Sequence, residues 1–172
     1  MSAALAGAWR KAAVALALGV TALDQLVKFF VTQVLELHER GLVGIELIPF
    51  FKLTYAENRG ISMGFFHAET DVMRWALVAM TMAVSAFVLW WIWREKERDD
   101  ALALGLVLGG AIGNIIDRVR LGYVIDYADF HIGEWRPFLI FNLADAAISI
   151  GVVILLARAL LLREKTAAKE SR

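Results

Sequence analysis

Four long runs of apolar residues dominate the pattern of the chain. They cover about residues 12–34, 75–93, 101–119 and 138–157, and each is close to the roughly 20 helical residues that cross about 30 Å of hydrocarbon. We therefore predict an all-α membrane protein with a bundle of four transmembrane helices. No internal repeat or low-complexity linker interrupts the pattern, so residues 1–172 are expected to form a single membrane domain.

Two connecting segments, about residues 35–74 and 120–137, lie on one side of the predicted bundle. The first contains the stretch Ile45–Tyr55, which is rich in β-branched and aromatic residues and alternates in part. This composition predicts short strands, and Pro49 would restrict a strand there to a sheet edge. We expect a small β-rich platform that lies on the outer membrane surface.

The first apolar run resembles a cleavable signal peptide in one respect, because Arg10 and Lys11 precede it. The apolar core of a signal peptide is about 7–15 residues long, whereas this run continues past Asp24 and Lys28 to Val34. We therefore expect it to be retained. Lys and Arg are slightly more numerous on the side that holds both termini, which predicts cytoplasmic termini and outward connecting segments.

The composition supports a membrane protein and excludes several chemistries. Hydrophobic residues make up 59% of the chain and the mean hydropathy is +0.60, whereas soluble domains are about 45–50% apolar. The formal net charge is zero, and no nucleic-acid-binding module is recognisable. The absence of cysteine excludes disulfides, thiolate metal sites and a cysteine nucleophile. His38, His67 and His131 lack the spacing of a zinc-binding helix, so we expect neither metal nor cofactor.

Carboxylates from several runs are predicted to reach one level of the membrane. Ionisable side chains there usually mark function, because each costs several kcal/mol in a bilayer. At about 1.5 Å of rise per residue, Asp24, Asp117 and Asp145 lie roughly 18, 24 and 20 Å above the inner face. Asp126 follows the third run closely. We predict a shared polar pocket in the outer half of the membrane.

Some of these groups have structural explanations. Asp24 and Lys28 are four residues apart on one helical face and can pair, which favours a supporting role. Asn114, Asp117 and Arg118 end the third run and can form a polar network at the membrane interface. Both sets are therefore predicted to hold the bundle together.

Glycine positions predict a helix-packing face and a turn. Gly105, Gly109 and Gly113 form a small-residue face at four-residue spacing, which is typical of close helix packing. Asn58 and Gly60 are typical turn residues, and a role facing the substrate is equally open for them.

Asp126 and Asp145 are harder to explain as structural residues. Both lie among apolar neighbours, and no Lys or Arg lies within one turn of Asp145. Two such carboxylates can share a proton, so that one acts as a base on water and the other as an acid on a carbonyl. A proton or ion pathway remains an alternative. Asp129 and His131, nearby in sequence, are expected at the surface.

Five short motifs occur in order along the chain. They are Asp24-Gln25-Leu26-Val27-Lys28, Glu57-Asn58-Arg59-Gly60, Gly109-Gly110-Ala111-Ile112-Gly113-Asn114-Ile115-Ile116-Asp117-Arg118, Gly122-Tyr123-Val124-Ile125-Asp126 and Phe141-Asn142-Leu143-Ala144-Asp145-Ala146. Each motif alone is a weak signal. Together, and combined with four spans, they resemble the bacterial lipoprotein signal peptidases, also called signal peptidase II.

The resemblance implies an aspartic endopeptidase of the bacterial inner membrane. Such an enzyme removes the signal peptide of a prolipoprotein just before a cysteine that carries diacylglycerol, and the cyclic peptide globomycin inhibits it. The resemblance implies Asp126 and Asp145 as the catalytic pair, and a working monomer. It implies supporting or substrate-binding roles for Asp24, Lys28, Asn58, Gly60, Asn114, Asp117, Arg118, Asn142 and Ala144.

One stretch departs from the family pattern. After Gly60 the family commonly has small residues followed by Phe, whereas this chain has Ile61-Ser62-Met63. Met63 is also apolar and adaptable, so we expect a different substrate wall and the same reaction.

Overall fold

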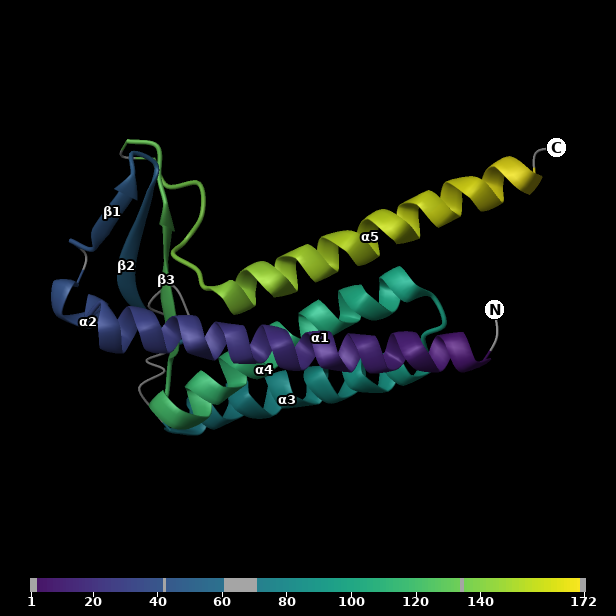
Figure 1. The fold of residues 1–172 in the computed structure, drawn as a ribbon, viewed down its shortest axis with the longest axis horizontal. Helices are drawn as coiled ribbons and strands as arrows, with labels where there is room; N and C mark the ends of the chain where they lie inside the picture. Colours follow the sequence, from purple (N-terminus) through teal and green to yellow (C-terminus); the bar gives the residue numbers. More distant parts are fainter. Residues whose placement is uncertain (1–2, 42, 61–70, 134, 171–172) are drawn as a thin grey trace.

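Four long helices form the body of the protein. The computed structural model describes residues 3–41, 43–60, 71–133 and 135–170. Within these residues, four helices are long and apolar enough to cross a membrane, as predicted. They are α1 (Ala3–Phe29), α3 (Asp71–Arg94), α4 (Arg98–Leu121) and α5 (Leu143–Glu170); a π-helix, η1 (Phe30–Val34), extends α1, and a short helix, α2 (Leu37–Arg40), follows (Figure 1).

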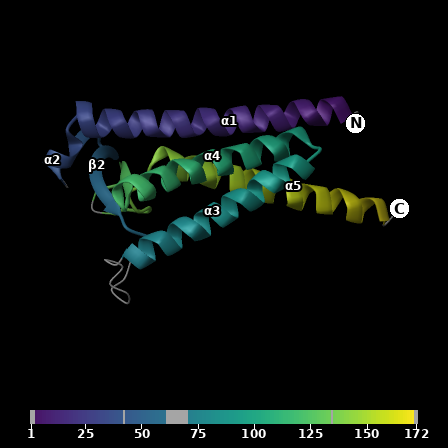
Figure 2. The same ribbon diagram turned by 90° about the horizontal axis from the view of Figure 1, so that it is seen from below.

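Helix α4 is the central element of the bundle (Figure 2). In the most apolar 18-residue stretch of α4, 56% of the residues are buried, whereas 17–22% are buried in the corresponding stretches of the other three spans. Gly105 and Gly109 permit this burial because neither has a side chain. A Cβ on Gly105 would lie 2.6 Å from the Ala13 carbonyl oxygen, and a Cβ on Gly109 would lie 2.6 Å from the Ala17 carbonyl oxygen. The predicted small-residue face therefore packs directly against the backbone of α1.

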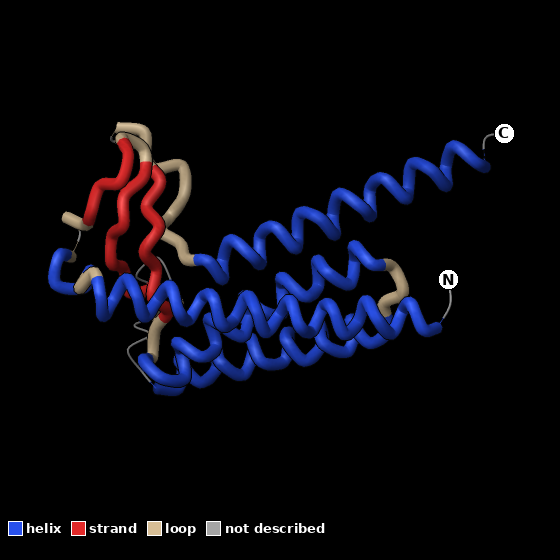
Figure 3. Tube along the Cα trace, in the orientation of Figure 1, coloured by secondary structure: helices blue, strands red, loops and turns tan. Residues whose placement is uncertain are grey.

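A small antiparallel sheet with the strand order β1-β2-β3 lies at the end of the bundle away from both termini (Figure 3). Strands β1 (Ile45–Ile48) and β2 (Phe51–Asn58) fall in the segment predicted to form strands, and Pro49 lies in the turn between them. The third strand, β3 (Val124–Phe130), is an addition to the predicted elements.

The sheet packs against the end of the first span. Val31 of η1 and Leu37 of α2 form one buried cluster with Ile125 and Tyr127 of β3. Because β3 also follows directly after α4, this packing fixes the position of Asp126 relative to α1 and α4.

The fourth long helix begins at Leu143, so the predicted start near residue 138 is wrong. Phe141 forms an antiparallel bridge with Ala128 of β3, with hydrogen bonds of 2.8 Å from Ala128 N to Phe141 O and 3.1 Å from Phe141 N to Ala128 O. The backbone at Phe141 is therefore paired with a strand and cannot join the helix. Asp145 lies in the first turn of α5, so a depth counted along a helix from residue 138 does not apply to it.

Arginine side chains fasten the helix ends to one another. At the sheet end, Arg74 of α3 donates to the carbonyl oxygens of Arg118 and Val119, which are among the last carbonyls of α4. At the opposite end, Arg158 of α5 pairs with Asp100 in the first turn of α4. These contacts fix the helices that carry the polar residues described next.

Candidate active site

Asn142 and Asp145 cap the start of α5 for each other. The Asp145 backbone N–H donates to Asn142 Oδ1 at 2.9 Å, and the Asn142 backbone N–H donates to Asp145 Oδ2 at 3.3 Å. This reciprocal arrangement is a capping box, built here from Asn and Asp at the N-cap and N3 positions. It holds the Asp145 carboxylate against the N-terminus of the helix.

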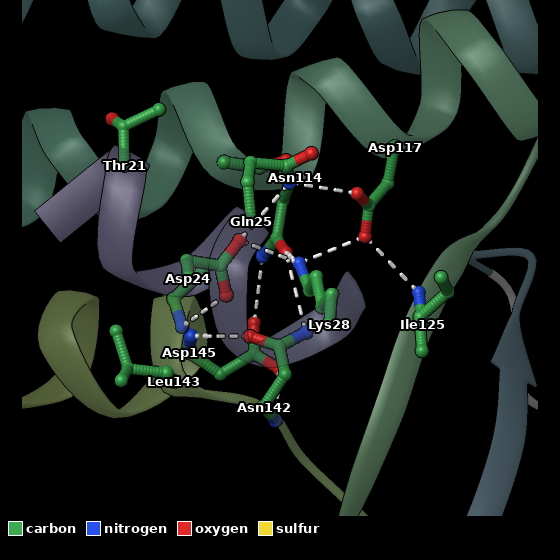
Figure 4. Close-up of polar contacts among 12 residues, drawn as sticks. Thr21, Asp24, Gln25, Lys28, Asn114, Asp117, Ile125, Asn142, Leu143 and Asp145 are labelled. Carbon is green, nitrogen blue, oxygen red and sulfur yellow. Dashed lines mark hydrogen bonds and ion pairs between the residues drawn. The ribbon is translucent and has the colours of Figure 1, made fainter. Parts of the chain in front are cut away.

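The other free N–H groups in the first turn of α5 also have partners. Leu143 N donates to the Tyr127 hydroxyl oxygen at 3.2 Å, and Ala144 N donates to Asp24 Oδ1 at 3.1 Å (Figure 4). The first turn is therefore held by β3 on one side and by α1 on the other. Ala144 itself is fully buried, so its role in the structure is packing and this backbone contact.

Two asparagine amides connect Asp126 with Asp145. Asn142 Nδ2 donates to Asp126 Oδ1 at 2.7 Å, and Asn114 Nδ2 donates to Asp145 Oδ1 at 2.8 Å. Asn142 Nδ2 also donates to Asn114 Oδ1 at 3.2 Å, which orients the second amide. The two carboxylates predicted as a pair are thus held by one hydrogen-bonded unit drawn from α4, β3 and α5.

The environment of Asp126 favours its protonated form. Its side chain is buried, and burial together with the charge of Asp145 raises the pKa from 3.8 to about 6. Hydrogen bonds from Asn58 and Asn142 and the charge of Lys28 oppose this increase. Asp126 therefore titrates in the range that suits a carboxylic acid acting as a proton donor.

Arg118 lies close enough to the two carboxylates to feel their charge. No ion pair joins Arg118 to Asp126 or Asp145 in the described part of the chain, and its Nε is buried without a hydrogen-bond partner there. The Nε–H of Arg118 is therefore an unused donor among the described residues.

Lys28 is the centre of a buried charge cluster (Figure 4). Its Nζ lies 2.8 Å from Asp24 Oδ2 and 2.8 Å from Asp117 Oδ2, and it donates to Asn114 Oδ1 at 3.2 Å. All three partners are at least nine-tenths buried. The predicted pairing of Asp24 with Lys28 is confirmed, and the structure adds Asp117 as a second carboxylate.

Gln25 belongs to the first sequence motif, which predicts no role for it, and the structure places its side chain in the polar network of the site. Its Nε2 donates to Asp117 Oδ1 at 2.9 Å and to the Gly113 carbonyl oxygen at 3.2 Å. Asp117 Oδ2 in turn accepts from the backbone N–H of Ile125 at 3.2 Å. This cluster therefore anchors β3 to α4 one residue before Asp126.

Asn58 and Gly60 form a turn at the end of β2, as predicted. Gly60 N donates to Asn58 Oδ1 at 2.9 Å, and the φ of Gly60 is +94°, a value that favours glycine. A hydrogen bond from the Asn58 side chain also stabilises the charged form of Asp126. The stretch Ile61-Ser62-Met63 and His67 lie outside the described residues.

Asp129 is buried, with 1% of its surface exposed, so the prediction that it lies at the surface is wrong. It pairs in register with Lys52 of β2 and contacts the Lys52 Nζ at 3.7 Å and the Arg136 Nε at 3.1 Å. These cations offset the cost of burying its charge. His131 is half-buried, and its Nε2 is buried without a partner among the described residues.

Comparisons with known proteins identify the family of the chain. The family described as signal peptidase (SPase) II matches residues 16–161. The chain is 57% identical over 152 residues to the lipoprotein signal peptidase of Rhizorhabdus wittichii, covering 88% of this chain and 87% of that protein. It is 55% identical over 150 residues to the lipoprotein signal peptidase of Sphingopyxis alaskensis, covering 87% of this chain and 86% of that protein.

The fold is also that of a solved structure. A bacterial membrane enzyme structure at 2.3 Å resolution has a TM-score of 0.75 and 25% sequence identity, and the match covers 94% of this chain and 93% of that chain. On these grounds the chain belongs to the signal peptidase II family of lipoprotein signal peptidases, which are aspartic peptidases that remove signal peptides from prolipoproteins.

Proposed function

We propose that Asp126 and Asp145 are the catalytic pair of this peptidase, with Asp145 as the base and Asp126 as the acid. The observation that carries this proposal is Asn142, whose side chain donates to Asp126 and whose backbone is joined to Asp145 in a capping box. Family membership removes the reason to keep the alternative of a proton or ion transporter.

The surroundings of the two aspartates differ, and this difference assigns the acid and base roles. Asp145 accepts hydrogen bonds from Asn114 Nδ2 and from Asn142 N at the start of α5. Asp126 is more deeply buried, and its pKa is raised to about 6. The raised pKa suits Asp126 to donate a proton, so we assign it as the acid and Asp145 as the base.

The reaction follows from these roles. Asp145 takes a proton from water, the resulting hydroxide adds to the scissile carbonyl carbon, and Asp126 gives its proton to the carbonyl oxygen, which yields a gem-diol. When this intermediate collapses, the C–N bond breaks, the departing amine takes the proton held by Asp145, and one gem-diol hydroxyl returns its proton to Asp126, so a carboxylic acid forms and both aspartates regain their starting states. Arg118, with free donor capacity beside the pair, would hold the substrate backbone.

The substrate we propose is a prolipoprotein whose cysteine already carries diacylglycerol, cleaved just before that cysteine. Asp126 belongs to β3 and Asp145 to the first turn of α5, and these two elements meet at the sheet end of the bundle, away from both termini (Figure 1). We propose that both termini are cytoplasmic and that the reaction takes place near the outer face of the bacterial inner membrane, where a lipid-bearing cysteine leaves the bilayer. We further propose that globomycin blocks the aspartate pair and that the enzyme works as a single-domain monomer.

Cleavage of a purified lipidated prolipoprotein tests this proposal. We expect Asp126→Asn and Asp145→Asn to fold and to lose activity by roughly 1,000-fold or more. Asp129→Asn is the matched control, because Asp129 is an equally buried carboxylate of the same strand whose partners lie outside the pair. Near-normal cleavage by either Asn variant of the pair would refute the assignment.

A further inference from the structure

A cavity of about 760 Å³ lies on the side of the protein formed by α1, η1, β2 and the end of α4. Neither Asp126 nor Asp145 lines it, so it is distinct from the catalytic pair. Its polar lining combines two cations, Lys28 and Arg120, with two carboxylates, Glu57 and Asp117. The other polar residues of the lining are Gln25, Thr32, Gln33, His38, Tyr55 and Tyr123.

The cavity borders an exposed apolar surface on the first membrane span. Phe29 and Leu121 form part of its wall and are 59% and 40% exposed. Below them on α1, Leu26 is 62% exposed on a helix that is apolar enough to span the membrane. A ligand with polar and apolar parts could therefore place one part in the cavity and the other along α1.

The electrostatics of the cavity favour an anionic group near Arg120. Its two carboxylates already have cationic partners: Asp117 lies 2.8 Å from Lys28, and Glu57 lies 2.8 Å from Arg59. Arg120, which is exposed, makes within the described residues one long hydrogen bond of 3.5 Å to Gln25 Oε1. Most of its donors are thus available to a phosphate, which guanidinium groups bind well.

Hydroxyl groups complete the polar lining. The hydroxyl oxygens of Tyr55 and Tyr123 lie 3.1 Å apart, so one of them donates to the other and the second keeps a free donor. Burial raises the pKa of Tyr55, so its hydroxyl stays protonated and can donate. Thr32 donates to the Lys28 carbonyl oxygen at 2.7 Å, and its oxygen accepts one long hydrogen bond of 3.5 Å from Gln33 Nε2, which leaves one lone pair for a ligand. This set suits the ester and glycerol oxygens that adjoin a phosphodiester.

We propose that this cavity binds the phosphodiester headgroup of a membrane glycerophospholipid, with the phosphate at Arg120 and the acyl chains along α1 beside Phe29. The ligand is a lipid and not a free anion, because the cavity continues into the exposed apolar surface of the first span. The cavity shares Gln25, Lys28 and Asp117 with the buried charge cluster, but neither catalytic aspartate lines it. Lipid binding is therefore expected not to require the carboxylates of Asp126 and Asp145.

Native mass spectrometry of the full-length protein in detergent, titrated with phosphatidylglycerol, tests the site. We expect Arg120→Ala to weaken binding about tenfold or more, because a charged hydrogen bond is lost. Gln33→Trp should block the cavity and abolish binding. Arg40→Ala is the control, because Arg40 is an exposed cation of the neighbouring α2 that does not line the cavity. Asp126→Asn should bind as the wild type does.

Two ligand controls identify what the cavity recognises. Diacylglycerol with the same acyl chains lacks the phosphate and should bind at least tenfold more weakly than phosphatidylglycerol. Inorganic phosphate lacks the acyl chains and should not compete. Equal binding of phosphatidylglycerol by the wild type, Arg120→Ala and Gln33→Trp would overturn the proposal. Equal binding of diacylglycerol, or effective competition by inorganic phosphate, would also overturn it.

Discussion

Asn142 Nδ2 donates a 2.7 Å hydrogen bond to Asp126 Oδ1, and this contact joins a strand residue to the cap of a transmembrane helix. The same asparagine caps α5 through its Oδ1. One side chain therefore sets both the start of the helix that carries Asp145 and the orientation of Asp126. Its two functions can be separated by mutation.

Asn142→Ser should retain the helix cap and lose the bridge to Asp126. A serine hydroxyl can accept from the Asp145 backbone N–H, as the asparagine oxygen does, but it is too short to reach Asp126. We expect a melting temperature near that of the wild type and a fall in kcat of roughly 100-fold. Asn142→Ala should lose the cap as well, at about 1 kcal/mol. Thermal melting and cleavage kinetics on both variants distinguish these effects.

Asp24→Ala should destabilise the protein strongly. It removes one of the two carboxylates that pair with Lys28 at 2.8 Å and the acceptor for Ala144 N. Breaking a buried ion pair typically costs about 3–5 kcal/mol. Glu39→Ala, at an exposed site in α2, provides the control and should be close to neutral. Thermal melting in detergent measures the difference; an unchanged profile for Asp24→Ala would show that Asp24 is not a structural support.

The raised pKa of Asp126 predicts a pH-dependent stability. Between pH 3.8 and about 6 the unfolded carboxyl loses its proton while the native carboxyl keeps it, so stability falls as the pH rises through this window. Asp126→Asn does not titrate at this position. The variant should therefore gain stability relative to the wild type over this window, by as much as about 3 kcal/mol.

Melting curves of both proteins from pH 4 to pH 8 provide the measurement. The difference between wild type and Asp126→Asn should grow up to about pH 6 and then stay constant. Parallel curves across the whole range would show that Asp126 has an ordinary pKa in the native state.

Gly109→Ala should separate α1 from α4. A Cβ at this position would lie 2.6 Å from the Ala17 carbonyl oxygen, and backbone atoms cannot yield without moving the helix. We expect a destabilisation of roughly 1–3 kcal/mol from overpacking. Gly19→Ala is the matched control, because nothing lies within 4 Å of a Cβ there. That change should be neutral or stabilising by up to about 1 kcal/mol, because alanine favours helix. Equal melting temperatures for the two variants would contradict close packing at Gly109.

Local spacing was enough to predict much of the fold and part of the site. Apolar runs of membrane length predicted the four helices, and the i, i+4 spacing of Asp24 and Lys28 predicted their ion pair. Such features depend on residues within a few turns of one another, so they can be recognised in a single sequence.

Contacts between distant segments were not predictable in this way. The strand β3 depends on its pairing with β2, and the start of α5 depends on the bridge between Ala128 and Phe141. Asp129 was predicted at the surface because its cationic partner Lys52 lies on another strand, in a register that the sequence does not show. The capping box of Asn142 with Asp145 was visible as a local pattern, and its three-residue spacing was the signal that could have located the helix start.

The most direct test of the central claim is an experimental structure with a bound peptide that carries a hydroxyl-bearing tetrahedral carbon at the scissile position. Such a group occupies the place of the attacking water and the carbonyl oxygen. If Asp126 and Asp145 activate one water together, the hydroxyl will lie within hydrogen-bonding distance of both carboxyl groups. A hydroxyl bound by only one of them, with the other carboxyl turned away, would contradict the proposed mechanism.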